Sequence, residues 1–248
     1  MTALRRSTDP TPGYAVILGT FFTCVALVAG GCAAPAPSAD LPSPRPFQVR
    51  DLAKSDIDDV VDLHVDEVRE QLRSLANRLY KRNPRELNKS GLSADARLHQ
   101  LFGFRRPERI PAVRQCTGAH CIEQALAPDF AGDRVYAFVF GLTTMLEQAY
   151  NHKRSFYMLD DLDPQKLYNS ARNIEVAAWK LRSEKDARGE PVLLSHARPD
   201  EEPHFGYERL FGKLIAHQDM MARIVAGKTN RTIKGVVMRL AGFVFLPI

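Results

Sequence analysis

The feature that most constrains the fold is an uncharged run from Val135 to Leu146. Its residues leave hardly any polar face at helical spacing, and a helix that is apolar all round must be buried all round. Asp133 stands where a helix N-cap is expected, and Gly141 permits a close crossing by another helix. The run is shorter than the roughly 20 residues that a membrane-spanning helix needs. The sequence therefore predicts a central buried helix surrounded by other helices.

A long amphipathic helix is predicted before it, from a cap at Ser55 to about Arg82. Acidic residues crowd its first turn and basic residues its last turn, as the helix dipole favours. One face carries side chains at steps of three and four residues, namely Ile57, Val61, His64, Val65, Val68, Leu72, Leu75 and Leu79. A histidine on such a stripe is more often a satisfied core residue than a catalytic group.

Caps and periodicity predict the remaining helices. They are a short turn after Asn83-Pro84, a helix from Ala94 to Phe102 capped by Ser93, a helix from Asp163-Pro164 to about Ala187, a helix from about Phe205 to Ala226, and a helix through Leu240 capped by Thr232. Loops are expected at 104–115 and 151–162, and a short strand or extended link at 191–195. The predicted fold class is all-α, with a single domain of about five to seven helices.

The first 32 residues have the pattern of an export signal. Arg5 and Arg6 precede an uncharged run that ends in Val28-Ala29-Gly30-Gly31-Cys32. This segment resembles the lipobox of bacterial lipoproteins, in which small residues admit the cleavage site to the signal peptidase. The resemblance implies cleavage between Gly31 and Cys32, with a diacylglycerol and an N-acyl chain on Cys32. Several acyl chains hold a protein stably on a membrane, whereas one binds only marginally.

Two other interpretations of this segment stay open. An ordinary secretory signal cut after Ala34 would release a soluble protein, and the apolar run could remain as a membrane helix. In the lipoprotein interpretation, residues 1–31 are the signal peptide, 32–50 are the lipidated N-terminus and a Pro-rich tether, and 51–248 are a helical periplasmic domain. At about 3.1 Å per residue, the tether would hold that domain some 30 to 40 Å from the lipid surface.

Cysteine usage agrees with an oxidising compartment. Of four cysteines, Cys24 leaves with the signal and Cys32 is lipidated, so Cys116 and Cys121 remain to form a disulfide. We expect it to clamp a tight loop in which Gly118 takes a positive φ. A redox-active dithiol would more often be Cys-x-x-Cys, and His120 between the cysteines makes only an incomplete metal set.

No catalytic, metal or cofactor motif stands out. The seven histidines show no metal-binding spacing, and no P-loop, Gly-x-Ser-x-Gly elbow or dinucleotide fingerprint is present. The acids Asp160, Asp161 and Asp163 do not fit an EF-hand, since Lys166 and Arg172 occupy the positions of its glycine and its bidentate glutamate. A net charge of +5 is far from a nucleic-acid-binding signature. No catalytic residue, metal or cofactor is therefore assigned.

A few polar groups remain candidates for anion binding or catalysis. The arginines of the 104–115 loop, which are Arg105, Arg106, Arg109 and Arg114, could face an anion, although such clusters are usually only solvated. His64 with Glu67 and His217 with Asp219 are local pairs whose meaning depends on the fold. Glu175, four residues from Trp179, is a carboxylate whose pKa burial could tune.

The first functional hypothesis is a non-enzymatic envelope lipoprotein that binds another envelope protein or the cell-wall layer. Because Ala33 rather than Asp follows Cys32, the lipoprotein resemblance points to the periplasmic face of the outer membrane. A helical module that binds a small ligand is the alternative, and an envelope hydrolase is the third. A partner surface predicts an exposed apolar patch, for instance at Phe243–Ile248, whereas a ligand module predicts an enclosed cavity beside Phe138 and Phe140.

Overall fold

The computed structural model describes residues 56–103, 107–157, 162–197, 201–202, 204–229, 232–234 and 244–248, and side chains from residue 58 onward. All of them belong to one compact unit, Gln48–Ile248. The predicted signal peptide, the lipidation site at Cys32, the tether and the Ser55 cap lie outside the described residues. So do Arg105, Arg106, Asp160, Asp161 and Phe243.

The described part of the chain contains seven α-helices, one 3-10 turn and no strand, so the predicted all-α fold is confirmed. The elements are α2 (Asp56–Arg82), α3 (Pro84–Asn88), α4 (Ala94–Phe102), η2 (Pro111–Val113), α5 (Gly118–Leu126), α6 (Arg134–Ala149), α7 (Pro164–Ser183) and α8 (Gly206–Thr229). A single bridge joins Lys185 to Pro191, so the 191–195 segment is an extended link.

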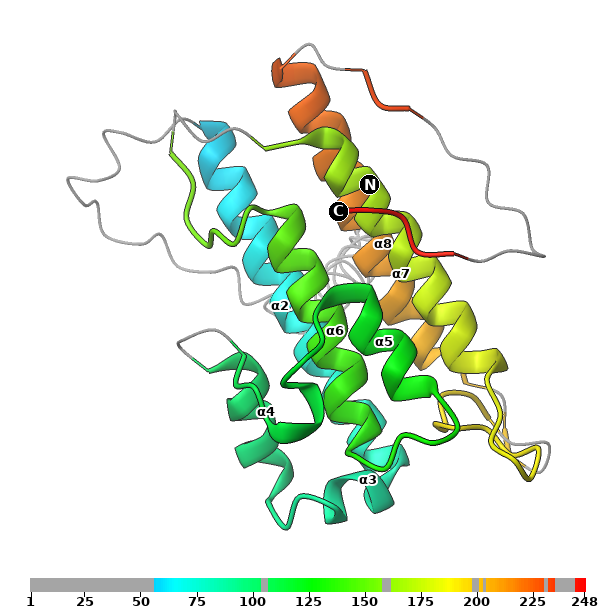
Figure 1. Cartoon of the computed structure of the whole chain (residues 1–248). Coiled ribbons are helices and arrows are strands. Elements are labelled where there is room, and N and C mark those ends of the chain that lie inside the picture. The colour runs from blue at the N-terminus through cyan, green and yellow to red at the C-terminus, as the bar shows by residue number, and fades with distance from the viewer. Residues whose placement is uncertain are drawn as a thin grey trace, which may run out of the picture. The chain divides into compact units, whose positions relative to one another are not determined.

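The long helices α2, α6, α7 and α8 pack as a bundle (Figure 1). Helix α2 lies against α6 and α8, and α7 lies against α8 and α6. Neighbours run antiparallel: Tyr80 near the end of α2 reaches Asp133 at the start of α6, and Lys228 near the end of α8 pairs with Asp58 at the start of α2. Antiparallel packing of neighbouring helices is usual in such bundles.

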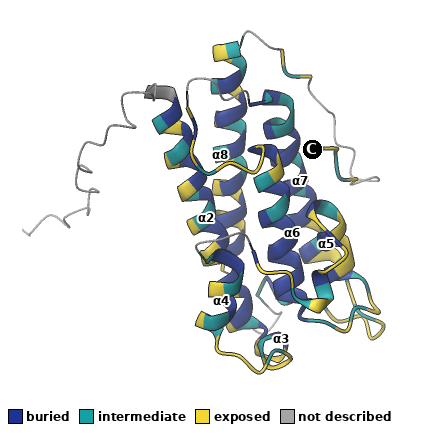
Figure 2. Ribbon diagram, turned by 60° about the vertical axis from the view of Figure 1, so that its left-hand side comes forward, coloured by how far each residue is buried: buried dark blue, intermediate teal, exposed yellow. Residues whose placement is uncertain are grey.

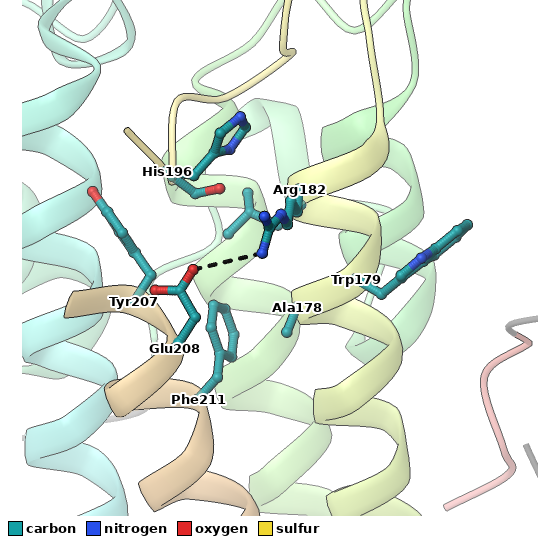
Figure 3. Close-up of a pocket in the computed structure, with 9 residues that line it drawn as sticks. Ala178, Trp179, Arg182, His196, Tyr207, Glu208 and Phe211 are labelled. Carbon is teal, nitrogen blue, oxygen red and sulfur yellow. Dashed lines mark ion pairs between the residues drawn. The ribbon is translucent and has the colours of Figure 1, made fainter. Parts of the chain in front are cut away.

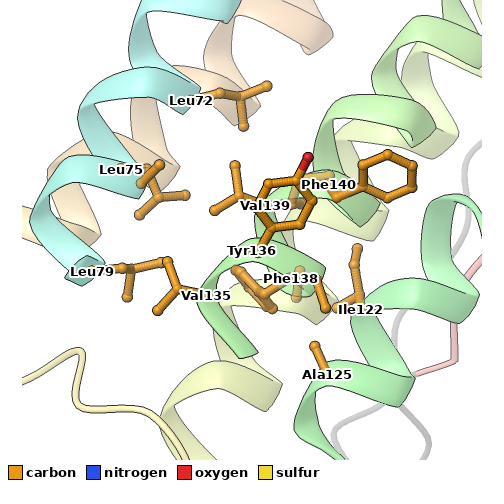
Figure 4. Close-up of a cluster of buried hydrophobic side chains, with 14 of the residues drawn as sticks. Leu72, Leu75, Leu79, Ile122, Ala125, Val135, Tyr136, Phe138, Val139 and Phe140 are labelled. Atoms are coloured by element: carbon orange, nitrogen blue, oxygen red, sulfur yellow. The ribbon is translucent and has the colours of Figure 1, made fainter. Parts of the chain in front are cut away.

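Helix α6 is the buried centre that its uncharged sequence predicts. Every residue from Arg134 to Thr143 is buried, and α6 is mostly dark in Figure 2. Leu72, Leu75 and Leu79 of α2 face Val135 and Val139 of α6, with Ile122 and Ala125 of α5 on the other side (Figure 4). The predicted apolar stripe of α2 is thus one wall of the core, and His64 is buried with it.

Gly141 makes the predicted close helix crossing possible. A Cβ atom at this position would lie 2.7 Å from Ile122 Cγ1, 2.8 Å from the Gly118 carbonyl oxygen and 2.9 Å from the Ile122 nitrogen. All three atoms belong to α5, which packs closely along α6. Only a residue without a side chain lets the two backbones approach this closely.

A buried polar network ties α2, α4 and α6 together at Asp133. Its side chain caps α6 by accepting a hydrogen bond from Tyr136 N at 2.9 Å, and it accepts another from the Tyr80 hydroxyl at 2.9 Å. The guanidinium of Arg97 pairs with the same carboxylate at 3.1 Å and lies 4.5 Å from the centre of the Tyr136 ring. Burial raises the pKa of Asp133, although these hydrogen bonds and the arginine charge oppose it.

The predicted caps are confirmed at two further helices. Ser93 accepts a hydrogen bond from Ala96 N at the start of α4, and Asp163 accepts one from Gln165 N at the start of α7. The Asp163 carboxylate therefore serves a helix start.

Helix α5 and two helix limits differ from expectation. The sequence does not predict α5, because a glycine, Gly118, occupies its first position and glycine is a poor helix former; its N-cap residue Thr117 makes no side-chain capping hydrogen bond. Helix α7 ends at Ser183 instead of Ala187, because Glu184 is extended and Val192 N bonds back to its carbonyl. Helix α8 continues past Gly227 to Thr229. Residues 232–234 are not helical, and most of the helix predicted after Thr232 lies outside the described residues.

The segment 244–248 lies along α7 (Figure 1). Phe245 and Ile248 are partly buried against the core, while Val244 is 67% exposed. Residues 244–248 therefore dock onto the domain and do not form the wholly exposed apolar patch that a partner surface predicts.

Candidate functional site

A small hollow opens between the last turns of α7 and the first turns of α8. It has a volume of about 270 Å³, slightly below the range of ordinary small-molecule pockets. Its walls are mainly apolar, with Ala178 on α7 and Phe211 on α8 beside it, while the Trp179 indole at its edge points away from Phe211 (Figure 3). The complete lining is Ala178, Trp179, Leu181, Arg182, Ser195, His196, Tyr207, Glu208 and Phe211.

Trp179 is the feature of this hollow most relevant to binding. Its side chain is 41% exposed, although most large apolar residues of the domain are buried. The α7 sequence explains this position, because Ala177, Ala178 and Leu181 turn toward the core and Trp179 falls on the opposite face. Tryptophan is enriched where binding energy concentrates in protein interfaces.

Opposite charges flank the hollow. Arg182 of α7 and Glu208 of α8 lie 3.9 Å apart (Figure 3), and both side chains are well exposed, so the pair adds little to folding stability. The Tyr207 hydroxyl donates to the Arg78 carbonyl at 3.0 Å, and burial raises the pKa of Tyr207 to about 12. Tyr207 is therefore neutral and structural, whereas Arg182 and Glu208 remain available to solvent.

A second hollow, of about 300 Å³, lies beside Phe140. It differs from the enclosed cavity expected for a ligand module, because it is partly open to solvent and Phe138 does not line it. Its lining is Pro107, Arg109, Thr117, Phe140, Thr144, Glu147, Gln148 and His152.

Most polar groups of the second hollow already serve the fold. Arg109 donates to the carbonyls of Arg114 and Cys116, so this predicted anion-binding arginine holds its own loop. The Thr144 hydroxyl donates to the Phe140 carbonyl and accepts from Gly118 N at 2.9 Å. Glu147 pairs with an arginine at 3.5 Å. His152 and Gln148, which also line this hollow, are both exposed to solvent.

The structure brings two histidines together that the sequence separates widely. His64 Nδ1 and His217 Nδ1 are 2.9 Å apart, and this contact joins α2 to α8. Burial lowers the pKa of His64, helped by the His217 charge and opposed by Glu67. The local pairs considered from the sequence do not form: Glu67 bonds to Gln71, and Asp219 bonds to Arg172.

No group of three or more His, Cys, Asp or Glu side chains positioned to hold a metal occurs among the described residues. Glu175 pairs with Arg172 at 3.0 Å; burial raises the pKa of Glu175, against the arginine charge.

The cysteines behave as the sequence suggests. The sulfur atoms of Cys116 and Cys121 are at bonding distance, 1.99 Å, with Cα atoms 5.1 Å apart. Gly118 between them has the expected positive φ of 55°. The segment is more than a loop, however, because α5 begins at Gly118 and the disulfide joins its first turn to the residues after η2.

The chain matches no protein-family model, no curated protein and no solved structure. Within the described residues, no helix is both long enough and apolar enough to cross a bilayer.

Proposed function

We propose that this protein is a lipid-anchored component of the bacterial envelope that binds another envelope protein or the cell-wall layer and catalyses no reaction. Its anchor is the diacylglycerol and N-acyl chain on Cys32, on the periplasmic face of the outer membrane. The support for the anchor is the Gly30-Gly31-Cys32 sequence and the Pro-rich stretch that follows it.

The observation that carries partner binding is Trp179. An exposed indole beside a small apolar hollow, with Arg182 and Glu208 next to it, has the composition of an interface hot spot. The hollow suits one apolar side chain of a partner better than a whole metabolite. The neighbouring charges would then fix the orientation of that partner.

The anchor is tested on the protein purified from cells. The intact mass of the mature chain is expected to equal residues 32–248 plus a diacylglycerol and an acyl chain, and the Cys32→Ala variant should carry neither. An unmodified chain that begins after Ala34 would support the secretory alternative. A chain that retains residues 1–31 would support the membrane-helix alternative.

Partner binding is tested by crosslinking in intact cells followed by affinity capture. The native chain should recover a defined envelope component, Trp179→Ala should lose it, and Cys32→Ala should lose it by mislocalisation. Tyr157→Ala is the matched control, since Tyr157 is also an exposed aromatic residue, 37% exposed, and lies outside this hollow. Equal recovery with Trp179→Ala would exclude this surface.

A small-ligand module is the second candidate, because the hollow beside Phe140 has the size of a small binding site and contains Arg109, Glu147 and His152. The last two are also the groups that a hydrolase would use there. Mass spectrometry of small molecules released from the purified protein separates this candidate from the first. A stoichiometric ligand that His152→Ala loses would favour it.

A further inference from the structure

Three amide side chains on one face of α7 hold the backbone of distant segments. Gln165, Asn169 and Asn173 are spaced four residues apart, which places them in one row along the helix. We call these residues the amide row. Asn173 is fully buried and Asn169 is 8% exposed.

Asn173 pairs with both backbone groups of a single residue, Leu246. Leu246 N donates to Asn173 Oδ1 at 2.6 Å, and Asn173 Nδ2 donates to the Leu246 carbonyl at 2.9 Å. The amide side chain therefore acts as a neighbouring β-strand would, by offering one acceptor and one donor to an extended backbone.

The hydrogen bonding of Asn169, the next amide in the row, matches a proline in the segment. Pro247 has no N–H to donate, and Asn169 accordingly only donates to it, from Nδ2 to the Pro247 carbonyl at 2.9 Å. The free acceptor, Asn169 Oδ1, takes a hydrogen bond from Gln165 Nε2 at 2.9 Å. Gln165 Oε1 in turn accepts from Lys234 N at 2.8 Å, and its Nε2 donates to the Lys234 carbonyl at 3.2 Å.

Backbone pairing of this kind reads the shape of a peptide, and the side chains that fit beside it set specificity. Phe245 and Ile248 supply those side chains here, because both are partly buried against the core. Val244, the first residue of the segment, is 67% exposed. Asparagine is also a poor helix former, so Asn169 and Asn173 contribute to α7 through what they bind more than through helix propensity.

From this geometry we infer that the amide row is a binding site for an extended apolar peptide, and that the chain's own residues 244–248 occupy it in competition with a segment of a partner protein. The ligand is an extended stretch with a backbone N–H and carbonyl opposite Asn173 and apolar side chains at the Phe245 and Ile248 positions. Proline is accepted opposite Asn169. Only one part of the inference rests on the proposed function, namely that the competing segment belongs to an envelope protein.

Exchange is feasible because few contacts hold the segment. Among the described residues, its backbone is held through Asn173 and Asn169, and three of its residues are only partly buried. Segments held in this way open at a lower free energy than helices packed in a core. The tethered segment has the advantage of a high effective concentration, so an added peptide with the same backbone pairing displaces it only when supplied in excess.

The test uses a fluorescent peptide of residues 242–248 and the full chain carrying Leu246→Pro. This substitution removes the N–H that Asn173 accepts and frees the row without shortening the chain. We expect the peptide to bind Leu246→Pro at least about tenfold more tightly than the wild-type chain, by fluorescence anisotropy. Adding Asn173→Ala should weaken that binding by about tenfold or more, because two hydrogen bonds are lost.

Asn83→Ala is the matched control for the loss of an amide. Asn83 makes the same two-way pairing with another backbone residue: Leu194 N donates to Asn83 Oδ1 at 2.8 Å, and Asn83 Nδ2 donates to the Leu194 carbonyl at 3.0 Å. Added to Leu246→Pro, it should leave peptide affinity unchanged. Absence of saturable binding by Leu246→Pro, or equal effects of Asn83→Ala and Asn173→Ala, would overturn the inference.

A measurement on the wild-type chain covers the case in which these variants fold poorly. At saturating peptide, amide hydrogen exchange at Leu246 of the protein should accelerate at least about tenfold, while exchange at Leu194 stays the same. Peptide binding without that acceleration places the peptide elsewhere and refutes the site. If Asn173→Ala still captured the same envelope partner as the wild-type chain, the peptide site would be refuted and the proposed function would stand. If the peptide exchanged but no partner were captured, the proposed function would be refuted and the peptide site would stand.

Discussion

Replacing glycine by alanine should have opposite effects at two positions of this bundle. In an open helix, alanine is more stable than glycine by about 1 kcal/mol. Gly212, in α8, has no atom within 4 Å of the place where a Cβ would stand. Gly212→Ala is therefore expected to stabilise the chain by about 0.5 to 1 kcal/mol.

At Gly141 the same methyl group meets three atoms of α5 closer than 3.0 Å, two of which belong to the backbone. Those atoms cannot rotate away, so α5 must shift along α6. Overpacking of a core costs about 1 to 3 kcal/mol, which exceeds the gain in helix propensity. We expect Gly141→Ala to destabilise the chain by about 1 to 2 kcal/mol.

The assay is thermal and urea unfolding of both variants, followed by circular dichroism. One kcal/mol corresponds to about 2 to 4 °C in a domain of this size, so the two melting temperatures should lie on opposite sides of the wild-type value. If Gly141→Ala were as stable as the wild-type chain, or more so, the tight contact between α5 and α6 would be wrong.

Three further outcomes are expected from unfolding measurements. The pKa of His64 is lowered in the folded state, so the unfolded chain binds more protons as the pH falls below about 6.5. The free energy of unfolding should therefore decrease as the pH falls through this range, and His64→Gln should flatten that dependence. Replacing Cys116 and Cys121 by serine should cost about 2 kcal/mol or less, since the closed loop is short; a larger loss in urea unfolding would mean that the bond also positions α5. Asp133→Ala should cost about 3 to 5 kcal/mol, because it leaves the buried Arg97 without its partner, and a loss below 1 kcal/mol would contradict the network.

The sequence predicts those parts of the fold that local signals control. Asp133, Ser93 and Asp163 cap helices as their side-chain chemistry suggests, and the uncharged run in α6 is buried as its composition requires. Prediction failed where glycine suggested that a helix was absent or ended. Helix α5 begins at Gly118, and α8 continues through Gly227 to Thr229.

Contacts between distant residues could not be predicted in the same way. The His64–His217 pair joins helices from opposite ends of the chain, and nothing near either residue specifies the other. The amide row left a visible trace, since Gln165, Asn169 and Asn173 recur every four residues. Their ligand, however, is supplied by residues more than 60 positions away, and only the fold reveals it.

The central claim is that the domain binds a partner through the surface around Trp179 while lipid holds it in the envelope. The most direct measurement places a photo-crosslinking amino acid at position 179 in living cells, with position 157 as the control. We expect one defined adduct at position 179, its loss when Cys32→Ala is added, and no matching adduct at position 157. The same adducts at both positions, or an adduct at 179 that persists without the lipid, would contradict the account.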